Sequence, residues 1–162
     1  MPERIPLGWF HTIMGIIALL SGGYTLYKYK EITLETRSSL IYLGTTFITA
    51  ATAMFIFQHG VFGPGHALGI MTFLALAVGL IAAKTQLFGR FSRQFQAIAF
   101  TGTLLFHCIP AVTDGLLRLP VGNPVLDTIE SPVLLMCYLA LLVAYLVGVT
   151  LQIRWMGRQV AA

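Results

Sequence analysis

Ionisable side chains inside an apolar run are the first feature of this chain that could do chemistry. His107, Asp114 and Arg118 stand at positions i, i+7 and i+11 of one such run. In an α-helix this spacing puts all three on one face. Ionisable groups are costly at membrane depth, so such a group is a candidate functional site by default. The run therefore predicts a helix face that binds a cofactor, pairs charges or carries protons.

Three more histidines stand at the ends of other apolar runs. His11 opens the first run, and His59 and His66 flank a turn rich in glycine and proline. Neutral imidazole is the commonest metal ligand, and two histidines on facing helices can hold a haem iron from both sides. The histidines predict a haem b site with His107 as its first ligand. His11 or His66 would be the partner ligand, and His59 is the remaining candidate.

A non-haem metal ion is the first alternative to haem. Zinc, copper or iron could be held by His107, His11 and His66, with Asp114 as a ligand or as the group that orients one. A proton relay or a small transporter is another alternative, because His and Asp line such pathways. Against this alternative, the other half of the membrane offers no ionisable residue to continue the path.

An accessory or structural membrane subunit without a cofactor is the remaining alternative. In this interpretation His59 and His66 cap a turn or anchor it at the interface. His107 and Asp114 form a buried polar pair that holds helices together, and Arg118 pairs with Asp114 four residues before it. The sequence leaves these alternatives open. It also does not decide whether the protein is a membrane oxidoreductase.

The amino-acid composition predicts the class of protein in which these residues lie. Of the 162 residues, 57% are hydrophobic and 10% are charged, and the mean hydropathy is +0.82. Soluble domains carry about 25% charged residues, so this chain cannot cover a soluble surface. It is predicted to be an all-α integral membrane protein with the lipid bilayer as its main partner. Nucleic acid is excluded as a partner, because the basic residues form no patch interleaved with aromatics.

The apolar runs predict a bundle of five transmembrane helices that forms a single domain over residues 1–162. A bilayer is crossed by about 20 apolar residues in a helix. The predicted spans are about 6–27, 40–58, 66–83, 95–117 and 133–153. Threonines are frequent in the second span, and their hydroxyl groups are expected to bond back to their own helix. Glycines in the first span, such as Gly15, Gly22 and Gly23, are expected to let helices approach closely.

The distribution of basic residues predicts the orientation of these spans. With five spans, one side of the membrane holds eight basic residues and the other holds only Arg4 and Arg118. The positive-inside rule then places the N-terminus outside and the C-terminus in the cytoplasm. All four histidines and Asp114 fall in the outer half. His107 is the deepest, roughly 16 Å inward from Arg118 at 1.5 Å per residue. The eight basic residues are Lys28, Lys30, Arg37, Lys84, Arg90, Arg93, Arg154 and Arg158.

Three motifs resemble a family of predicted bacterial membrane proteins that is catalogued as a domain of unknown function. They are His11-x-x-x-Gly15-x-x-Ala18-Leu19-x-x-Gly22, the turn Gly63-Pro64-Gly65-His66-Ala67-Leu68, and the run from His107 through Asp114 to Pro120. Two positions depart from the family pattern. The acidic position is often glutamate in the family, and relatives often have a His-Arg pair where this chain has Thr36-Arg37. The resemblance covers spans one to four and implies a bacterial inner-membrane helical bundle without an established activity.

These observations combine into one functional hypothesis. The chain is expected to be a small multi-pass protein of the bacterial cytoplasmic (inner) membrane that binds haem b, or a metal ion, near the outer face. Electron transfer is the expected role, with another membrane protein or a quinone as the electron partner.

Overall fold

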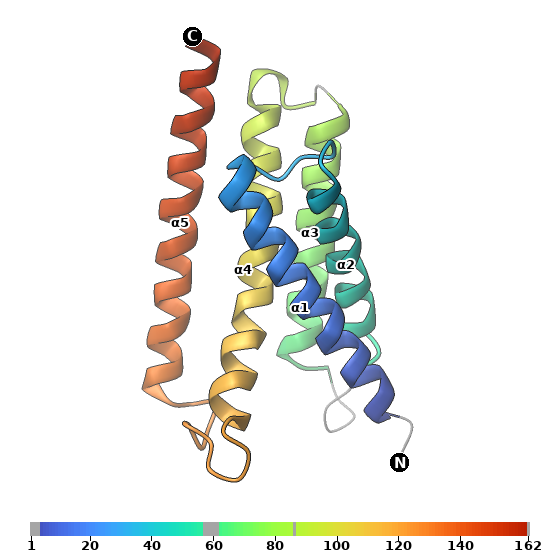
Figure 1. Cartoon of the computed structure of the whole chain (residues 1–162), viewed down its shortest axis with the longest axis vertical. Helices are drawn as coiled ribbons and strands as arrows, with labels where there is room; N and C mark the ends of the chain where they lie inside the picture. Colours follow the sequence, from blue (N-terminus) through green and yellow to red (C-terminus); the bar gives the residue numbers. More distant parts are fainter. Residues whose placement is uncertain (1–3, 57–61, 86, 162) are drawn as a thin grey trace. The chain divides into compact units, whose positions relative to one another are not determined.

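A computed structural model gives the structure of the chain and describes residues 4–56, 62–85 and 87–161 (Figure 1). These residues form five α-helices and one short 3-10 helix, with no strand in the described ranges. The predicted all-α class is therefore confirmed. The elements are α1 (Arg4–Tyr29), α2 (Arg37–Ala53), α3 (Pro64–Lys84), η1 (Gly89–Phe91), α4 (Ser92–Arg118) and α5 (Pro132–Ala161).

Four of the helical segments are long and apolar enough to cross a membrane, which indicates a membrane protein. They are Pro6–Tyr29, Pro64–Lys84, Gly89–Arg118 and Pro132–Gln159. Helix α2 has only 17 residues and is about 26 Å long at 1.5 Å per residue, slightly less than a hydrocarbon core of about 30 Å. The count of five spans therefore stays a prediction.

The predicted second span, 40–58, extends beyond the end of α2. The N–H groups of Met54 and Phe55 bond to the carbonyls of Ala51 and Thr52, three residues back, at 3.2 and 3.0 Å. This tighter bonding closes the last turn and ends the helix at Ala53. Residues 57 and 58 lie outside the described ranges. The other four predicted spans fall within the observed helices, although α5 continues beyond 153 to Ala161.

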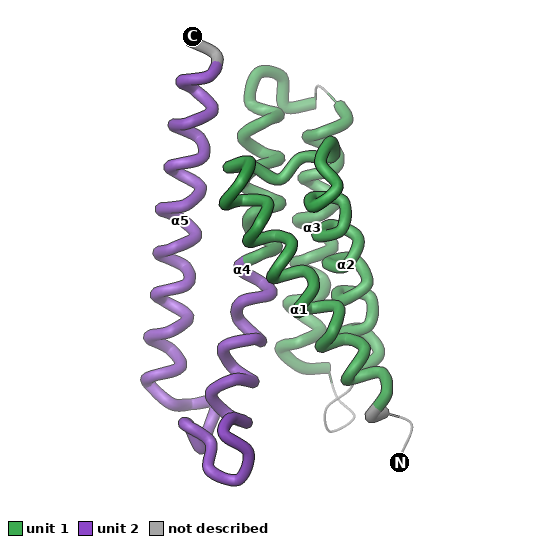
Figure 2. The backbone as a smooth tube through the Cα atoms, in the orientation of Figure 1, with its two compact units in different colours: residues 1–104 green, residues 105–162 purple. Residues whose placement is uncertain are grey.

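The chain divides into two compact units (Figure 2). The first unit, residues 1–104, contains α1, α2, α3 and the first half of α4. The second unit, residues 105–162, contains the rest of α4 and α5. His11 and His66 therefore belong to the first unit, whereas His107 and Asp114 belong to the second.

The first unit is an antiparallel helix bundle whose two ends differ in chemistry. At one end Arg93 at the start of α4 binds Glu31, which follows α1, through two contacts of 2.6 and 3.0 Å. Nearby, the Gln96 side chain donates to the carbonyl of Ile32 at 2.9 Å. At the other end, His11 near the start of α1 contacts Thr52 near the end of α2 at 2.9 Å. Helix α2 therefore runs from one end of this unit to the other.

Two buried aromatic rings pack against glycines in the centre of the first unit. Tyr42 and Phe100 are both 0% exposed. A β-carbon at Gly22 would lie only 2.8 Å from the ring of Tyr42, and one at Gly79 would overlap the ring of Phe100. Small residues thus let the helix backbones lie against aromatic rings, as expected for Gly22. Gly23 has open space beside it, so the expectation is wrong for that position.

The hydroxyl group of Tyr42 links α2 to α4. It lies 2.5 Å from Thr103 Oγ1 and donates to the carbonyl of Phe100 at 3.3 Å. Thr103 donates to the same carbonyl at 2.8 Å. Tyr42 and Thr103 are both fully buried, so these bonds form away from water.

Replacement of Tyr42 by phenylalanine is expected to lower the free energy of unfolding by about 0.6–1.7 kcal/mol, the range measured for hydrogen bonds between membrane helices. The measurement is unfolding in mixed detergent micelles. Tyr27→Phe is the matched control, because Tyr27 is 80% exposed and its loss of a hydroxyl should change stability by less than about 0.5 kcal/mol. Equal effects of the two substitutions would contradict the interhelical role of Tyr42.

A second pair of hydroxyl groups joins the helices of the second unit. Thr113 of α4 donates to the carbonyl of Ile109 at 2.7 Å. The hydroxyl group of Tyr138 in α5 lies 2.6 Å from Thr113 Oγ1, and it donates to Thr113 when the Thr113 proton is directed at the carbonyl of Ile109. This bond fixes one helix face of α4 against α5 within the unit.

Candidate functional site

The His11 side chain contacts the Thr52 hydroxyl group. His11 Nδ1 lies 2.9 Å from Thr52 Oγ1. Thr52 Oγ1 also lies within hydrogen-bond distance of the carbonyls of Ile48 at 2.9 Å and Thr49 at 3.0 Å. With its proton directed at these carbonyls, Thr52 Oγ1 accepts from His11 Nδ1–H, and the neutral ring then has its lone pair on Nε2. With the other tautomer of His11, Thr52 donates to Nδ1 instead.

With Nδ1–H donating to Thr52, His11 would match the pattern of a histidine that binds a metal ion through Nε2. Such ligands donate one ring N–H to an oxygen atom of the protein, which fixes the ring orientation and raises the basicity of the other nitrogen. His11 is half-buried, with α1 on one side of the contact and α2 on the other. The role of His11 as a ligand stays a prediction, in which Thr52 would be the group that orients the ring.

The His66 side chain has its tautomer set by Gly63. The backbone N–H of Gly63 donates to His66 Nδ1 at 3.1 Å. A backbone N–H can only donate, so the neutral ring carries its hydrogen on Nε2. The ring also stacks on Phe62, with 4.9 Å between the ring centroids, and the residue is only 4% exposed. His66 therefore caps the start of α3, as the structural alternative expects, and could bind a metal ion only by giving up this arrangement.

His107 and Asp114, both in the second unit, differ in exposure. His107 is 8% exposed, whereas the Asp114 side chain is 60% exposed. Asp114 Oδ1 forms an ion pair with Arg118 Nε, four residues further along α4, at 3.1 Å. The expected Asp114–Arg118 pair is confirmed. It is an exposed ion pair of a kind that contributes about 0–1 kcal/mol, so its role is to neutralise charge at the end of the helix.

The predicted candidate His59 lies within residues 57–61, outside the described ranges. Among the residues that the structure does describe, no three His, Cys, Asp or Glu side chains gather to hold a metal ion. The alternative of a site built from His107, His11, His66 and Asp114 therefore gains no support from the geometry. A haem iron is different, because the porphyrin supplies four of its ligands and the protein needs to supply only the axial ones.

Thr52 is a residue of the candidate site that the sequence alone did not single out. The hydroxyl groups of Thr45, Thr49 and Thr52 all donate to carbonyls of their own helix, as expected. The second role of Thr52, as the hydrogen-bond partner of His11, depends on a residue 41 positions away. One signal was present: these three threonines recur at i, i+4 and i+7, which places them on one face of α2.

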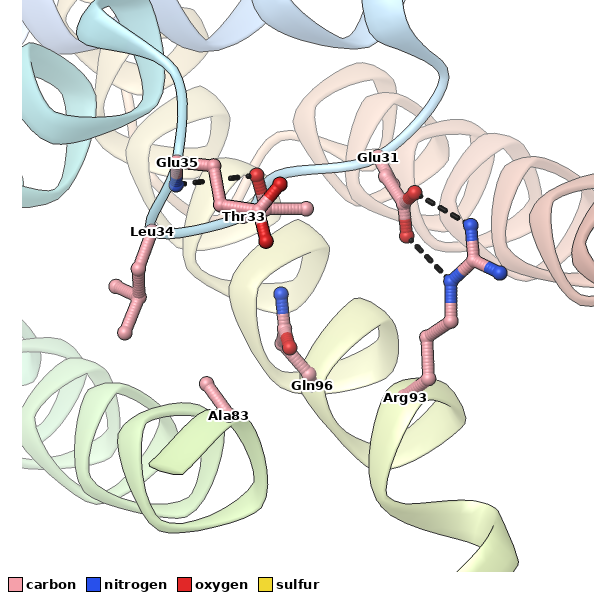
Figure 3. Close-up of a pocket in the computed structure, with 7 residues that line it drawn as sticks. All are labelled: Glu31, Thr33, Leu34, Glu35, Ala83, Arg93 and Gln96. Atoms are coloured by element: carbon pink, nitrogen blue, oxygen red, sulfur yellow. Dashed lines mark hydrogen bonds and ion pairs between the residues drawn. The ribbon is translucent and has the colours of Figure 1, made fainter. Parts of the chain in front are cut away.

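A charged cavity of about 290 Å³ lies at the opposite end of the first unit. Figure 3 shows the carboxylate of Glu31 joined to the guanidinium of Arg93 by two hydrogen bonds, and Gln96, also on α4, lines the cavity with them. Glu31 binds Arg93, and Gln96 binds the carbonyl of Ile32. These bonds hold the connection between α1 and α2 against the start of α4. Its lining residues are Glu31, Thr33, Leu34, Glu35, Ala83, Arg93 and Gln96.

No family model, no curated protein and no solved structure matches this chain. The resemblance to a bacterial membrane family of unknown function stays a prediction from the motifs. The side-chain geometry of the described residues therefore carries the functional argument.

Proposed function

We propose that this chain is a small multi-pass protein of the bacterial cytoplasmic membrane that binds haem b through His11 and transfers electrons near the outer face. The observation that carries the proposal is the contact between His11 Nδ1 and Thr52 Oγ1, through which Thr52 can orient the ring with its lone pair on Nε2. A haem iron is held by a neutral imidazole of this kind. Bound haem would supply a one-electron couple, and a quinone or another membrane protein would be the electron partner.

The orientation in the membrane follows from the charges at the two ends of the first unit. Basic residues of the two connections, such as Lys30, Lys84 and Arg93, stand at the end opposite to His11. Under the positive-inside rule the basic end faces the cytoplasm and His11 faces outward. This topology requires α2 to cross the membrane, which local thinning of the bilayer around its 17 residues would allow. A reporter fused after Ala162 should then be active only in the cytoplasm, and an active periplasmic reporter would overturn the topology.

Haem and metal content measured on one sample test the proposed cofactor. The protein is purified in mild detergent, and haem is quantified as its pyridine complex while metals are determined by elemental analysis. Stoichiometric haem supports the proposal. A metal ion in place of haem would support the non-haem alternative. A folded sample with neither would overturn the proposal in favour of the accessory subunit. His107→Ala tests separately the sequence prediction that His107 is a ligand.

Replacement of Thr52 by valine is expected to weaken haem binding roughly 10–100-fold, the usual effect of removing the group that orients a histidine ligand. Valine keeps the shape of threonine but cannot accept the bond from His11 Nδ1. The measurement is titration of the haem-free protein with haemin in detergent. Thr45→Val is the matched control, because the Thr45 hydroxyl bonds to the carbonyls of Ile41 and Tyr42 in its own helix. Equal affinities of the two variants would rule out the orienting role of Thr52.

A further inference from the structure

A second cavity at the basic end of the first unit is not used by the proposed function. It has a volume of about 350 Å³ and lies where α3, η1 and α4 meet. Among the residues that the structure describes, no acidic side chain lines it. The lining residues are Ala82, Ala83, Lys84, Thr85, Gly89, Arg90, Ser92, Arg93 and Gln96.

Positive charge dominates this cavity. Of its three basic side chains, Arg93 is matched by the carboxylate of Glu31. Lys84 and Arg90 form no ion pair with any described residue, although Arg90 lies over the ring of Phe91 at 4.7 Å. Two cations thus face the cavity without a carboxylate to balance them. The buried hydroxyl of Ser92 also has no hydrogen-bond partner among the described residues. Together these groups provide charge and donors for an anion.

The surroundings of the cavity are those of a membrane interface. Lys84 ends the apolar helix α3. The nearby side chains of Leu87, Phe91 and Phe95 are 72%, 49% and 40% exposed. Exposed apolar side chains beside basic ones are typical of the depth at which acyl chains meet head groups. Basic pockets between membrane helices on the cytoplasmic side bind phosphate-bearing head groups.

We propose that this cavity binds the phosphate of an anionic phospholipid head group from the cytoplasmic leaflet. Lys84 and Arg90 supply the charge, and Ser92 donates a hydrogen bond to a phosphate oxygen. The acyl chains of the lipid would lie along the exposed apolar side chains of Leu87, Phe91 and Phe95. The proposal concerns a different end of the unit from His11 and does not depend on haem.

Lipid binding by the full chain tests this site. The protein is purified in a neutral detergent and titrated with phosphatidylglycerol, phosphatidylcholine or inorganic phosphate, and retained lipid is measured by native mass spectrometry. The wild-type protein should prefer phosphatidylglycerol. The double substitution Lys84→Gln and Arg90→Gln should weaken this binding roughly 30-fold, since each basic residue near an anionic surface contributes about a fivefold factor.

A double variant with Lys28→Gln and Arg37→Gln is the matched control, because it removes the same charge from the same end of the unit but outside the cavity. Its affinity should stay close to that of the wild type. Equal weakening in both double variants would show diffuse attraction and overturn the site. Equal binding of phosphatidylglycerol and phosphatidylcholine would also overturn the site. Tight binding of inorganic phosphate would show that the cavity takes free phosphate and not a lipid head group. Ser92→Ala alone, expected to weaken binding severalfold, provides a second variant if the double substitution fails to fold.

Discussion

Replacement of His11 by alanine is expected to abolish haem binding by the purified chain. The substitution removes the imidazole that is proposed to hold the haem iron. The protein should still fold, because His11 is half-buried and its hydrogen bond with Thr52 is worth about 0.6 kcal/mol. The measurement is the haem content of the variant after purification, together with its unfolding midpoint.

His66→Ala is the control that separates a ligand from a structural histidine. It removes the cap on α3 that Gly63 and His66 form, which should cost about 0.5–2 kcal/mol of stability. It should leave the haem content unchanged. Loss of haem in His66→Ala together with its retention in His11→Ala would reverse the assignment of the two residues.

Replacement of Gly79 by alanine is expected to lower the free energy of unfolding by about 1–3 kcal/mol, or more, through overpacking. The added methyl group would overlap the ring of Phe100. That ring is 0% exposed and is enclosed by its neighbours, so it cannot move aside without disturbing the core. Unfolding in mixed micelles measures the change.

Gly23→Ala is the control for the glycine substitution. A β-carbon at Gly23 meets nothing within 4 Å, and alanine is favoured over glycine in a helix by about 1 kcal/mol. This variant should therefore be neutral or more stable. The double variant Gly79→Ala with Phe100→Leu should recover part of the lost stability, because the smaller leucine leaves room for the added methyl group. A Gly79→Ala protein as stable as the wild type would show that the α3–α4 packing is wrong.

The helices were predictable because the bilayer demands long apolar segments. Four of the five predicted spans lie within observed helices, since about 20 apolar residues in a row have few other folds available. The end of α2 was not predictable from hydropathy. Residues 54–56 are as apolar as the helix before them, and only the hydrogen bonds of Met54 and Phe55 end the helix at Ala53.

The chemistry of each histidine was predictable only where its partner is local. His66 bonds to Gly63, three residues before it, so a turn-capping role could be foreseen from the Gly-Pro-Gly-His turn. His11 bonds to Thr52, 41 positions away, and this contact depends on how α1 packs on α2. The Arg93–Glu31 pair likewise joins residues 62 apart. The sequence shows that such residues are polar, but it does not show which of them come into contact in the folded chain.

The absorption spectrum of the purified protein, recorded oxidised and after reduction with dithionite, tests the central claim most directly. The claim is that His11, oriented by Thr52, holds a haem b iron. The wild-type protein should show a Soret band and the reduced-minus-oxidised difference bands of a b-type haem, and His11→Ala should lose them while it stays folded. A wild-type protein that is folded, colourless and without these bands, even after addition of haemin, would contradict the claim.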